Sequence, residues 1–260
     1  MIKAAYHTTR FWIVIILFSI IFGTLSVLAR LVDSSSNLSH KVSQLWGRWL
    51  CVFNGIRVEV EGLEHVKADE AQIFIANHQG FFDIFALSGY LPAQIRWVAK
   101  SNLFHIPFVG WSMRACGYIP VDRDNRKKAY HAFLASIEKL KMGCSIVIFP
   151  EGTRSADGTI GPFKKGGPLL SVRSGAPLVP VTLIGTGNII PKGSMIVRPG
   201  RVHIIISPPV SSQKVAEEKE ENVLKELRET ICRNYERELP RGSQREPTLQ
   251  TDGTSTGTGS

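Results

Sequence analysis

Residues 73–83 have the sequence Ile-Phe-Ile-Ala-Asn-His-Gln-Gly-Phe-Phe-Asp and mark the change from a strand to a helix. Residues 73–76 are an apolar run, which is typical of the end of a buried strand. The turn-forming residues 77–80 follow, and a second apolar run begins at Phe81. The pattern therefore predicts that His78 lies at the rim of a sheet, where a strand gives way to a helix.

His78 and Asp83 are the candidate catalytic pair. Within one continuous helix, five residues correspond to about 140° of rotation, which would point the two side chains apart. A break at Gly80 lets His78 precede the first helical turn, so that Asp83 can fold back to the imidazole. A carboxylate on one ring nitrogen fixes the tautomer and frees the other nitrogen to take a proton from a hydroxyl. The alternative is an ordinary polar loop histidine, because this spacing also occurs by chance.

The composition is that of a folded domain with a basic middle. The chain has 260 residues, of which 43% are hydrophobic, enough for one large domain or two small ones. Between residues 96 and 173, thirteen Lys and Arg stand against five Asp and Glu, which predicts an anionic ligand or a basic membrane-facing surface. The four cysteines lack metal-ligand spacing, so we expect reduced thiols and neither a zinc site nor a disulfide framework.

The first 54 residues are expected to form membrane-anchoring helices. Residues 11–29 are nineteen residues without a charge, and as a helix they would be about 28 Å long. A signal peptide is the rival interpretation, but the run is long and no clear cleavage site follows. Whether this helix spans the bilayer or lies in one leaflet is open. Residues 38–53 form a second amphipathic helix, suited to a membrane interface or to ordinary core packing.

Apolar runs separated by helical stretches predict an α/β fold with a mostly parallel central sheet flanked by helices. This α/β domain is assigned to residues 55–239, and the Ser-, Thr- and Gly-rich residues 240–260 are expected to be disordered. Residues 101–114 are too broken by Pro and Gly for one helix, whereas residues 214–239 are expected to form one surface helix. The remaining strands are expected at residues 56–60, 95–99, 117–121, 144–149, 176–184 and 202–206.

A second polar cluster follows the apolar run 144–149. In a parallel sheet, Glu151 and Arg154 would lie on the same edge as His78. Gly152 lets backbone N–H groups approach a ligand, and the guanidinium of Arg154 can bind a phosphate through two donors. Glu151 could hold a substrate hydroxyl or orient Arg154, and a purely structural ion pair between the two is the alternative. Two further cations, Lys100 and Arg123, also follow apolar strands.

Together these stretches resemble the glycerolipid acyltransferase family, and within it the 1-acylglycerol-3-phosphate acyltransferases. The first family motif, Asn-His-x-x-x-x-Asp, is matched by Asn77, His78 and Asp83. Phe-Pro-Glu-Gly-Thr-Arg-Ser is complete at residues 149–155. Looser matches are residues 117–123, where Tyr-Ile-Pro-Val replaces the usual Phe-Ile pair, the Val-Pro-Val of residues 179–181, and Lys100 with residues 107–110. The matches keep the family order across roughly residues 56–210.

The resemblance implies an enzyme that moves an acyl chain from acyl-CoA or acyl carrier protein to the free hydroxyl of lysophosphatidic acid, giving phosphatidic acid. His78 would be the base and Asp83 would orient it and stabilise its imidazolium. The implied location is the bilayer surface, with the active site on the cytoplasmic face of the inner (plasma) membrane. Neither a metal, a further cofactor nor a nucleic acid is implied. The implied substrate-binding residues are Asn77, Lys100, Arg123, Glu151, Gly152, Thr153 and Arg154.

Three rival functions remain. The nearest is an acyltransferase for another acceptor, such as glycerol 3-phosphate or another lysolipid, because these share the motifs. A membrane-anchored lipid hydrolase could use the His–Asp pair to activate water, but the expected α/β domain, residues 55–239, has no G-x-S-x-G elbow. A peripheral protein that binds anionic membranes would explain the charge and the anchor, but not the two polar clusters at successive strand ends.

Overall fold

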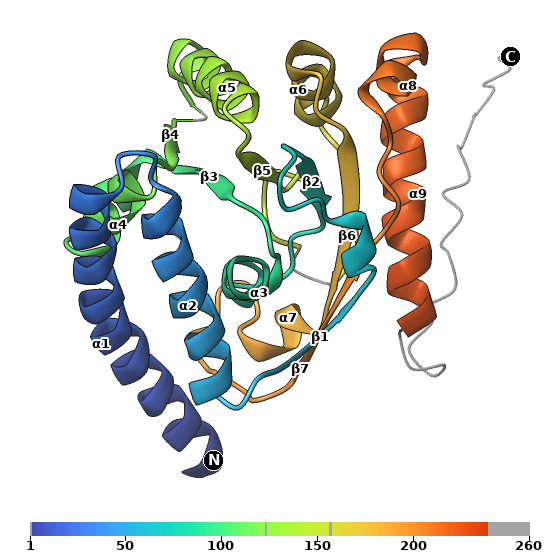
Figure 1. The fold of residues 1–260 in the computed structure, drawn as a ribbon. Helices are drawn as coiled ribbons and strands as arrows, with labels where there is room; N and C mark the ends of the chain where they lie inside the picture. Colours follow the sequence, from blue (N-terminus) through green and yellow to red (C-terminus); the bar gives the residue numbers. More distant parts are fainter. Residues whose placement is uncertain (1, 123, 156–157, 239–260) are drawn as a thin grey trace, which may run out of the picture.

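A seven-stranded sheet forms the centre of the protein, with the strand order β1-β7-β6-β2-β5-β3-β4 (Figure 1). The structure is a computed structural model, and it describes residues 2–122, 124–155 and 158–238. The expected tail, residues 240–260, lies outside the described residues. The strands are β1 (Arg57–Glu61), β2 (Ile73–Ala76), β3 (Ile95–Lys100), β4 (Ile119–Val121), β5 (Ser145–Ile148), β6 (Leu178–Ile184) and β7 (Arg201–Ile206).

Five strands run in one direction and two run in the other. Strands β6, β2, β5, β3 and β4 are mutually parallel, which confirms the predicted α/β class. Strand β7 pairs antiparallel to β6, and β1 pairs parallel to β7. This reversal was not predicted, because the sequence gives strand positions but not their directions. The carboxyl ends of the five parallel strands meet at one edge of the sheet, where function gathers in α/β folds.

Helices cover both faces of the sheet (Figure 1). One layer includes α3 (Phe82–Tyr90), α7 (Thr186–Ile189), α2 (Asn37–Phe53) and α1 (Ile2–Val32). The other includes α5 (Arg126–Lys141), α6 (Gly166–Ser174), α8 (Ser212–Glu217) and α9 (Glu220–Glu238). The broken stretch after β3 forms η2 (Ser101–His105) and α4 (Val109–Ala115), as expected, and η1 (Leu63–His65) follows β1.

The helix predicted over residues 214–239 is in fact two helices. Ser211 caps α8, since its side chain accepts a hydrogen bond from the backbone N–H of Lys214. The backbone then becomes extended at Glu218, with φ −87° and ψ 156°, which ends α8 before α9 begins. The helical spacing of apolar residues that led to this prediction belongs to α9, in which Val223, Leu227 and Ile231 are buried.

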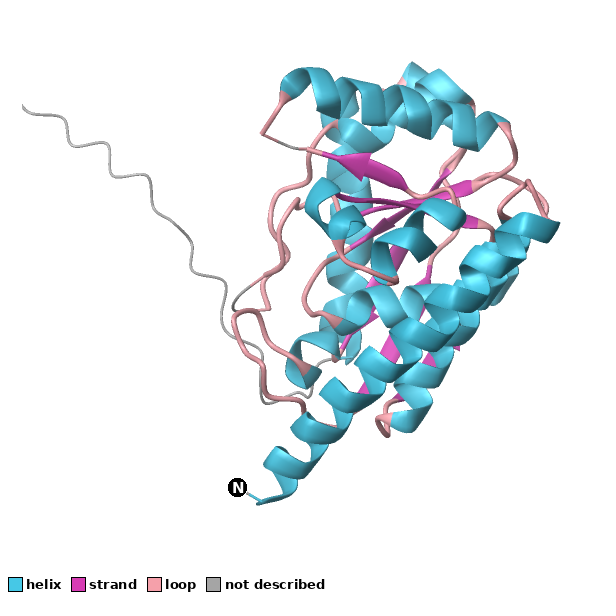
Figure 2. Cartoon of the chain, turned by 90° about the vertical axis from the view of Figure 1, so that its left-hand side faces the viewer, coloured by secondary structure: helices cyan, strands magenta, loops and turns pink. Residues whose placement is uncertain are grey.

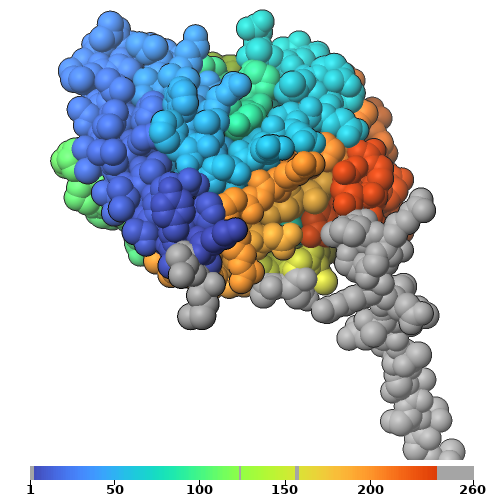
Figure 3. Space-filling model, turned by 90° about the horizontal axis from the view of Figure 1, so that it is seen from below, coloured from blue at the N-terminus to red at the C-terminus, as the bar shows by residue number. Residues whose placement is uncertain are grey.

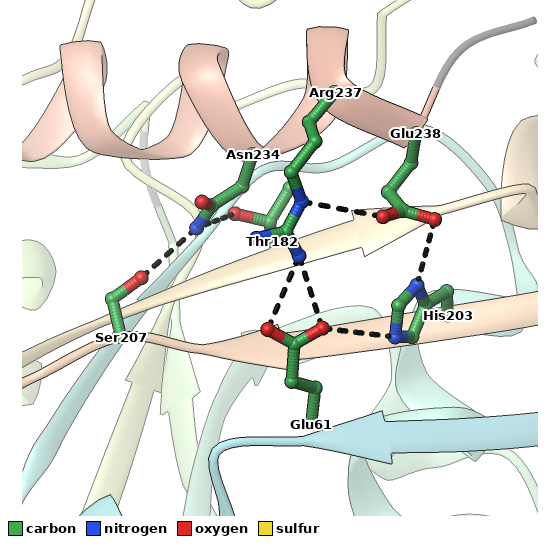
Figure 4. Close-up of polar contacts among 7 residues, drawn as sticks. All are labelled: Glu61, Thr182, His203, Ser207, Asn234, Arg237 and Glu238. Atoms are coloured by element: carbon green, nitrogen blue, oxygen red, sulfur yellow. Dashed lines mark hydrogen bonds and ion pairs between the residues drawn. The ribbon is translucent and has the colours of Figure 1, made fainter.

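The end of α9 is fastened to the reversed strands by a polar network (Figure 4). Arg237 donates to both carboxylate oxygens of Glu61 on β1, at 3.1 and 2.9 Å. His203 of β7 lies 3.3 Å from the carboxylate of Glu238 and 3.7 Å from that of Glu61. About one helical turn before Arg237, Asn234 donates to the hydroxyl of Ser207 at 2.9 Å. These contacts tie α9 to the strands that run opposite to the others.

Helix α1 is bound to the α/β part near its N-terminus (Figures 2 and 3). Phe11 is fully buried in the core cluster that includes α3. The indole N–H of Trp12 donates to the carbonyl of Met195 at 3.2 Å. The hydroxyl of Thr8 accepts a hydrogen bond from the backbone N–H of Val197 at 3.0 Å. One side of α1 is therefore part of the protein core.

The other side of α1 is exposed and apolar. The helix is long and apolar enough to cross a membrane, and most of its apolar stretch is not buried within the protein. Helix α2 adds exposed aromatic and aliphatic side chains. The exposed large apolar residues of the two helices that lie within the predicted anchoring segments are Ile13, Ile16, Leu17, Ile20, Ile21, Leu25, Leu28, Leu38, Leu45, Trp49, Val52 and Phe53.

A buried histidine joins α2 to the start of β3. The Nε2 atom of His40 lies 3.1 Å from the backbone nitrogen of Ile95 and 3.2 Å from the carbonyl oxygen of Ala93, and its Nδ1 atom lies 3.1 Å from the hydroxyl oxygen of Tyr118. That hydroxyl in turn donates to Ser43 at 2.9 Å. Burial, together with the nearby positive charge of the buried Arg96, lowers the pKa of His40 to about 3. The folded protein therefore keeps this ring neutral.

This histidine should make the protein less stable in acid. The pKa of His40 is about 3 when folded and 6.5 in the absence of its environment, so between these values the unfolded chain binds the extra proton. The free energy of unfolding should then fall as pH decreases below 6.5, by up to about 1.4 kcal/mol per pH unit. His40→Gln, which can keep an acceptor without titrating here, should show a shallower slope.

The measurement is urea unfolding in detergent at several pH values between 4 and 7.5. His131→Gln is the matched control, because His131 is exposed on α5. An acid slope that is the same in wild type and His40→Gln would show that His40 does not control it.

Candidate active site

The loop between β2 and α3 brings His78 and Asp83 together. His78 lies two residues after Ala76, the last residue of β2, and α3 begins only at Phe82, so the histidine precedes the helix. The Nδ1 atom of His78 lies 2.6 Å from Oδ2 of Asp83, which confirms the contact predicted from the sequence. The same oxygen accepts the backbone N–H groups of residues 79 and 80, at 2.8 and 3.0 Å. The loop is therefore folded around one carboxylate oxygen.

Two neighbours of His78 explain why the loop can adopt this shape. A Cβ on Gly80 would lie 2.3 Å from the carbonyl oxygen of Thr186, so only glycine allows the loop to approach the segment after β6. The amide of Asn77 donates to the carbonyl of Leu183 at 2.9 Å and accepts from its N–H at 2.7 Å. The Asn77 side chain is fully buried. It joins β2 to β6 and is not open to a substrate, in contrast to the binding role predicted for it.

An aromatic ring fixes the plane of the imidazole. The ring of His78 stacks on Phe149 with centroids 4.0 Å apart and planes 14° apart, and Trp97 lies beyond Phe149 at 6.1 Å. The His78 side chain is 18% exposed. No described residue forms a hydrogen bond with its Nε2 atom, so this nitrogen is available to a substrate. This stacking was not predicted from the sequence. The only signal for it was that Phe149 directly precedes the Pro-Glu-Gly sequence at the end of β5.

Glu151 holds the two polar loops together. Its Oε1 atom accepts the backbone N–H of His78 at 2.8 Å, and its Oε2 atom accepts that of Gly161 at 3.1 Å. The backbone N–H of Ser155 donates to the carbonyl of His78 at 2.8 Å. No ion pair joins Glu151 to Arg154, although the structure describes both side chains. The Glu151 carboxylate thus binds backbone donors and not Arg154, whereas its predicted contact with a substrate hydroxyl stays a prediction.

The predicted cations are distributed along this edge of the sheet. Gly152 has a φ of +79°, in the left-handed region that favours glycine, and Thr153 after it is exposed. Arg154 is half-buried, and its guanidinium has no hydrogen-bond or ion-pair partner within the described part of the chain. Lys100 is exposed at the carboxyl end of β3. Arg123 lies outside the described residues, so its predicted role stays a prediction.

Comparison with known proteins identifies the family of the chain. The family described as Acyltransferase matches residues 57–184, from the start of β1 to the end of β6. A 1-acyl-sn-glycerol-3-phosphate acyltransferase of Pseudomonas aeruginosa is 31% identical, over 80% of this chain and 82% of that protein. The chain belongs to the acyltransferase family. The matched region contains both polar clusters, so the family indicated by the motifs is confirmed.

Other members of the acyltransferase family agree in sequence and in fold. The crystal structure of the 1-acyl-sn-glycerophosphate (LPA) acyltransferase PlsC from Thermotoga maritima is 30% identical, with a TM-score of 0.81, and covers 91% of this chain and 96% of that one. The chloroplastic 1-acyl-sn-glycerol-3-phosphate acyltransferase BAT2 of Brassica napus is 36% identical over 67% of this chain. The chain spans about half the length of that relative, 51%.

Proposed function

We propose that this protein transfers an acyl chain from a thioester, acyl-CoA or acyl carrier protein, to the free hydroxyl of lysophosphatidic acid, and so produces phosphatidic acid. The observation that carries the proposal is the Nε2 atom of His78, which is open to a substrate while Asp83 holds the other ring nitrogen. The names of the relatives support the choice of acceptor. Another lysolipid or glycerol 3-phosphate is the alternative acceptor.

The site geometry supports a direct transfer. Nε2 of His78 takes the proton of the acceptor hydroxyl as the oxygen attacks the thioester carbonyl, and Asp83 stabilises the resulting imidazolium. The C–S bond then breaks, and the thiol leaves with the proton that His78 returns. The acyl chain passes from sulfur to oxygen without an acyl-enzyme, so this chemistry needs no nucleophilic side chain, metal or further cofactor.

We assign the acceptor phosphate to the cations on the same edge. Arg154 offers two parallel donors to a phosphate and has no described partner of its own, and Lys100 and Arg123 follow neighbouring strands. Gly152 and Thr153 would line the same anion site through the backbone and the exposed hydroxyl. Glu151 and Asn77 act in the proposal as positioning residues, since they bind the backbone of the two loops.

The proposed chemistry is tested by following thiol release from acyl-CoA. Purified protein should release thiol when lysophosphatidic acid is present, and faster than with glycerol 3-phosphate or lysophosphatidylcholine. His78→Ala should lower kcat by about 10²- to 10⁴-fold, because the general base is lost. The control His131→Ala, changed at an exposed position on α5, should retain the wild-type rate. Thiol release that does not depend on an acceptor would instead indicate a hydrolase, and near-normal turnover in His78→Ala would reject the base.

Arg154→Ala should weaken binding of the acceptor and leave binding of the donor unchanged. Hydrogen bonds to a charged group contribute about 1.5–3 kcal/mol, so the KM for lysophosphatidic acid should rise about 10- to 100-fold. The KM for acyl-CoA should change little. Arg173→Ala, on the exposed surface of α6, is the control. If steady-state kinetics show neither KM nor kcat altered in Arg154→Ala, the phosphate is bound elsewhere.

We propose further that α1 lies within one leaflet, with the active site on the cytoplasmic face, where both thioester donors are dissolved. The inner side of α1 is bonded to the α/β part through Thr8 and Trp12, and its far half to α2 through Ser26 and Ser39. A spanning α1 would carry these bonded polar segments into the hydrocarbon, where unsolvated backbone is costly. The exposed side chains of the outer side would contact the acyl chains of lipids.

Spin labels along the outer side of α1 can separate the two arrangements. Ile13, Ile20 and Leu28 are 59%, 40% and 51% exposed and lie about two helical turns apart from one another along α1. Labels placed singly at these positions in vesicles should all show burial depths within one leaflet. A depth profile that passes through the bilayer centre and returns toward the opposite surface would establish a spanning helix.

A further inference from the structure

Lys164 lies beside the polar loop after β5, at a position that the sequence did not single out. Its backbone N–H donates to the carbonyl of Pro150 at 3.0 Å, which fixes the start of the segment leading to α6. Gly161, three residues earlier, is held by the Glu151 carboxylate that also binds His78. The backbone of this segment is thus positioned relative to the candidate base.

The Lys164 side chain crosses the loop over Gly152. A Cβ on Gly152 would lie 2.7 Å from the Nζ atom of Lys164 and 3.3 Å from its Cε atom. The lysine therefore occupies the space that any other residue at position 152 would fill with its own side chain. This places an ammonium group over the residue that lies between Glu151 and the loop position of Arg154.

Within the part of the chain that the structure describes, the Lys164 ammonium has no ion-pair partner, whereas the next lysine has one. Among the described residues, no carboxylate lies within 4.0 Å of the Lys164 Nζ atom, and no acceptor forms a hydrogen bond with it. Lys165, by contrast, is 3.5 Å from the carboxylate of Glu220. Both lysines are exposed. Two adjacent residues of the same type thus differ in one respect, because one is paired on the outer helices and the other extends over the polar loop.

We propose that Lys164 is a second phosphate-binding cation of the active site, acting beside Arg154. A guanidinium binds two oxygens of a phosphate in its plane, and an ammonium can bind a remaining oxygen as a point charge. The inference rests on the proposed function. The acceptor and acyl-CoA both carry phosphate groups, and the position of Lys164 over Gly152, two residues before Arg154, favours the phosphate of the acceptor.

The test compares Lys164→Met, Lys165→Met and Lys164→Arg in the full-length protein. Methionine keeps most of the aliphatic stem over Gly152 and removes the charge. All variants should therefore have the melting temperature of the wild type. Lys164→Met should raise the KM for lysophosphatidic acid about tenfold, with kcat much less affected. Lys165→Met should match the wild type, and Lys164→Arg should recover most of the affinity. A rise confined to the KM for acyl-CoA would assign the same cation to a donor phosphate.

A binding measurement separates this inference from the proposed reaction. Glycerol 3-phosphate, added without a donor, should raise the melting temperature of the wild type and of Lys165→Met more than that of Lys164→Met. If the wild type shows no acyl transfer, the proposed function fails, and this comparison still tests the cation. Equal behaviour of Lys164→Met and Lys165→Met in both KM values and in the melting shift would overturn the role of Lys164.

Discussion

The hydrogen bond between His78 Nδ1 and Asp83 Oδ2 is the contact on which the site depends. Asp83 is fully buried, and burial of a carboxylate is costly unless donors surround it. One of its oxygens accepts three donors, the imidazole and the N–H groups of Gln79 and Gly80. The same carboxylate therefore determines both the fold of the loop and the position of the base. Stacking on Phe149 removes the remaining freedom of the ring.

The order of the strands brings the second polar loop to this pair. Strands β2 and β5 are neighbours, so the residues that follow them lie side by side, and Glu151 can bind the backbone of His78. The reversal of direction occurs beyond β6, between β6 and β7, and leaves the edge formed by the five parallel strands intact. The network around Glu61 and Arg237 fastens α9 to the two reversed strands.

The sequence pattern of residues 73–83 predicted the geometry of the loop between β2 and α3. The apolar run, the break at Gly80 and the spacing to Asp83 were enough to place the histidine before the helix and the carboxylate against it. The partners of Glu151 and Asn77 could not be predicted, because they depend on which strand lies beside which, and chain order does not reveal that. The same holds for the pairing of Lys165 with Glu220. Adjacent lysines look alike in the sequence, and only the packing of α6 against its neighbours distinguishes them.

The N-terminal helices and the catalytic loop are mechanically connected. A boundary at residue 54 divides the sequence by composition, yet Phe11 and Leu50 lie in the same core cluster as α3. Trp46 of α2 packs edge-on against Phe85 of α3, with ring centroids 5.1 Å apart. Helix α3 carries Asp83 in its first turn. A membrane that sets the orientation of α1 and α2 therefore sets, through one packed helix, the orientation of the base relative to the lipid surface from which an acceptor would come.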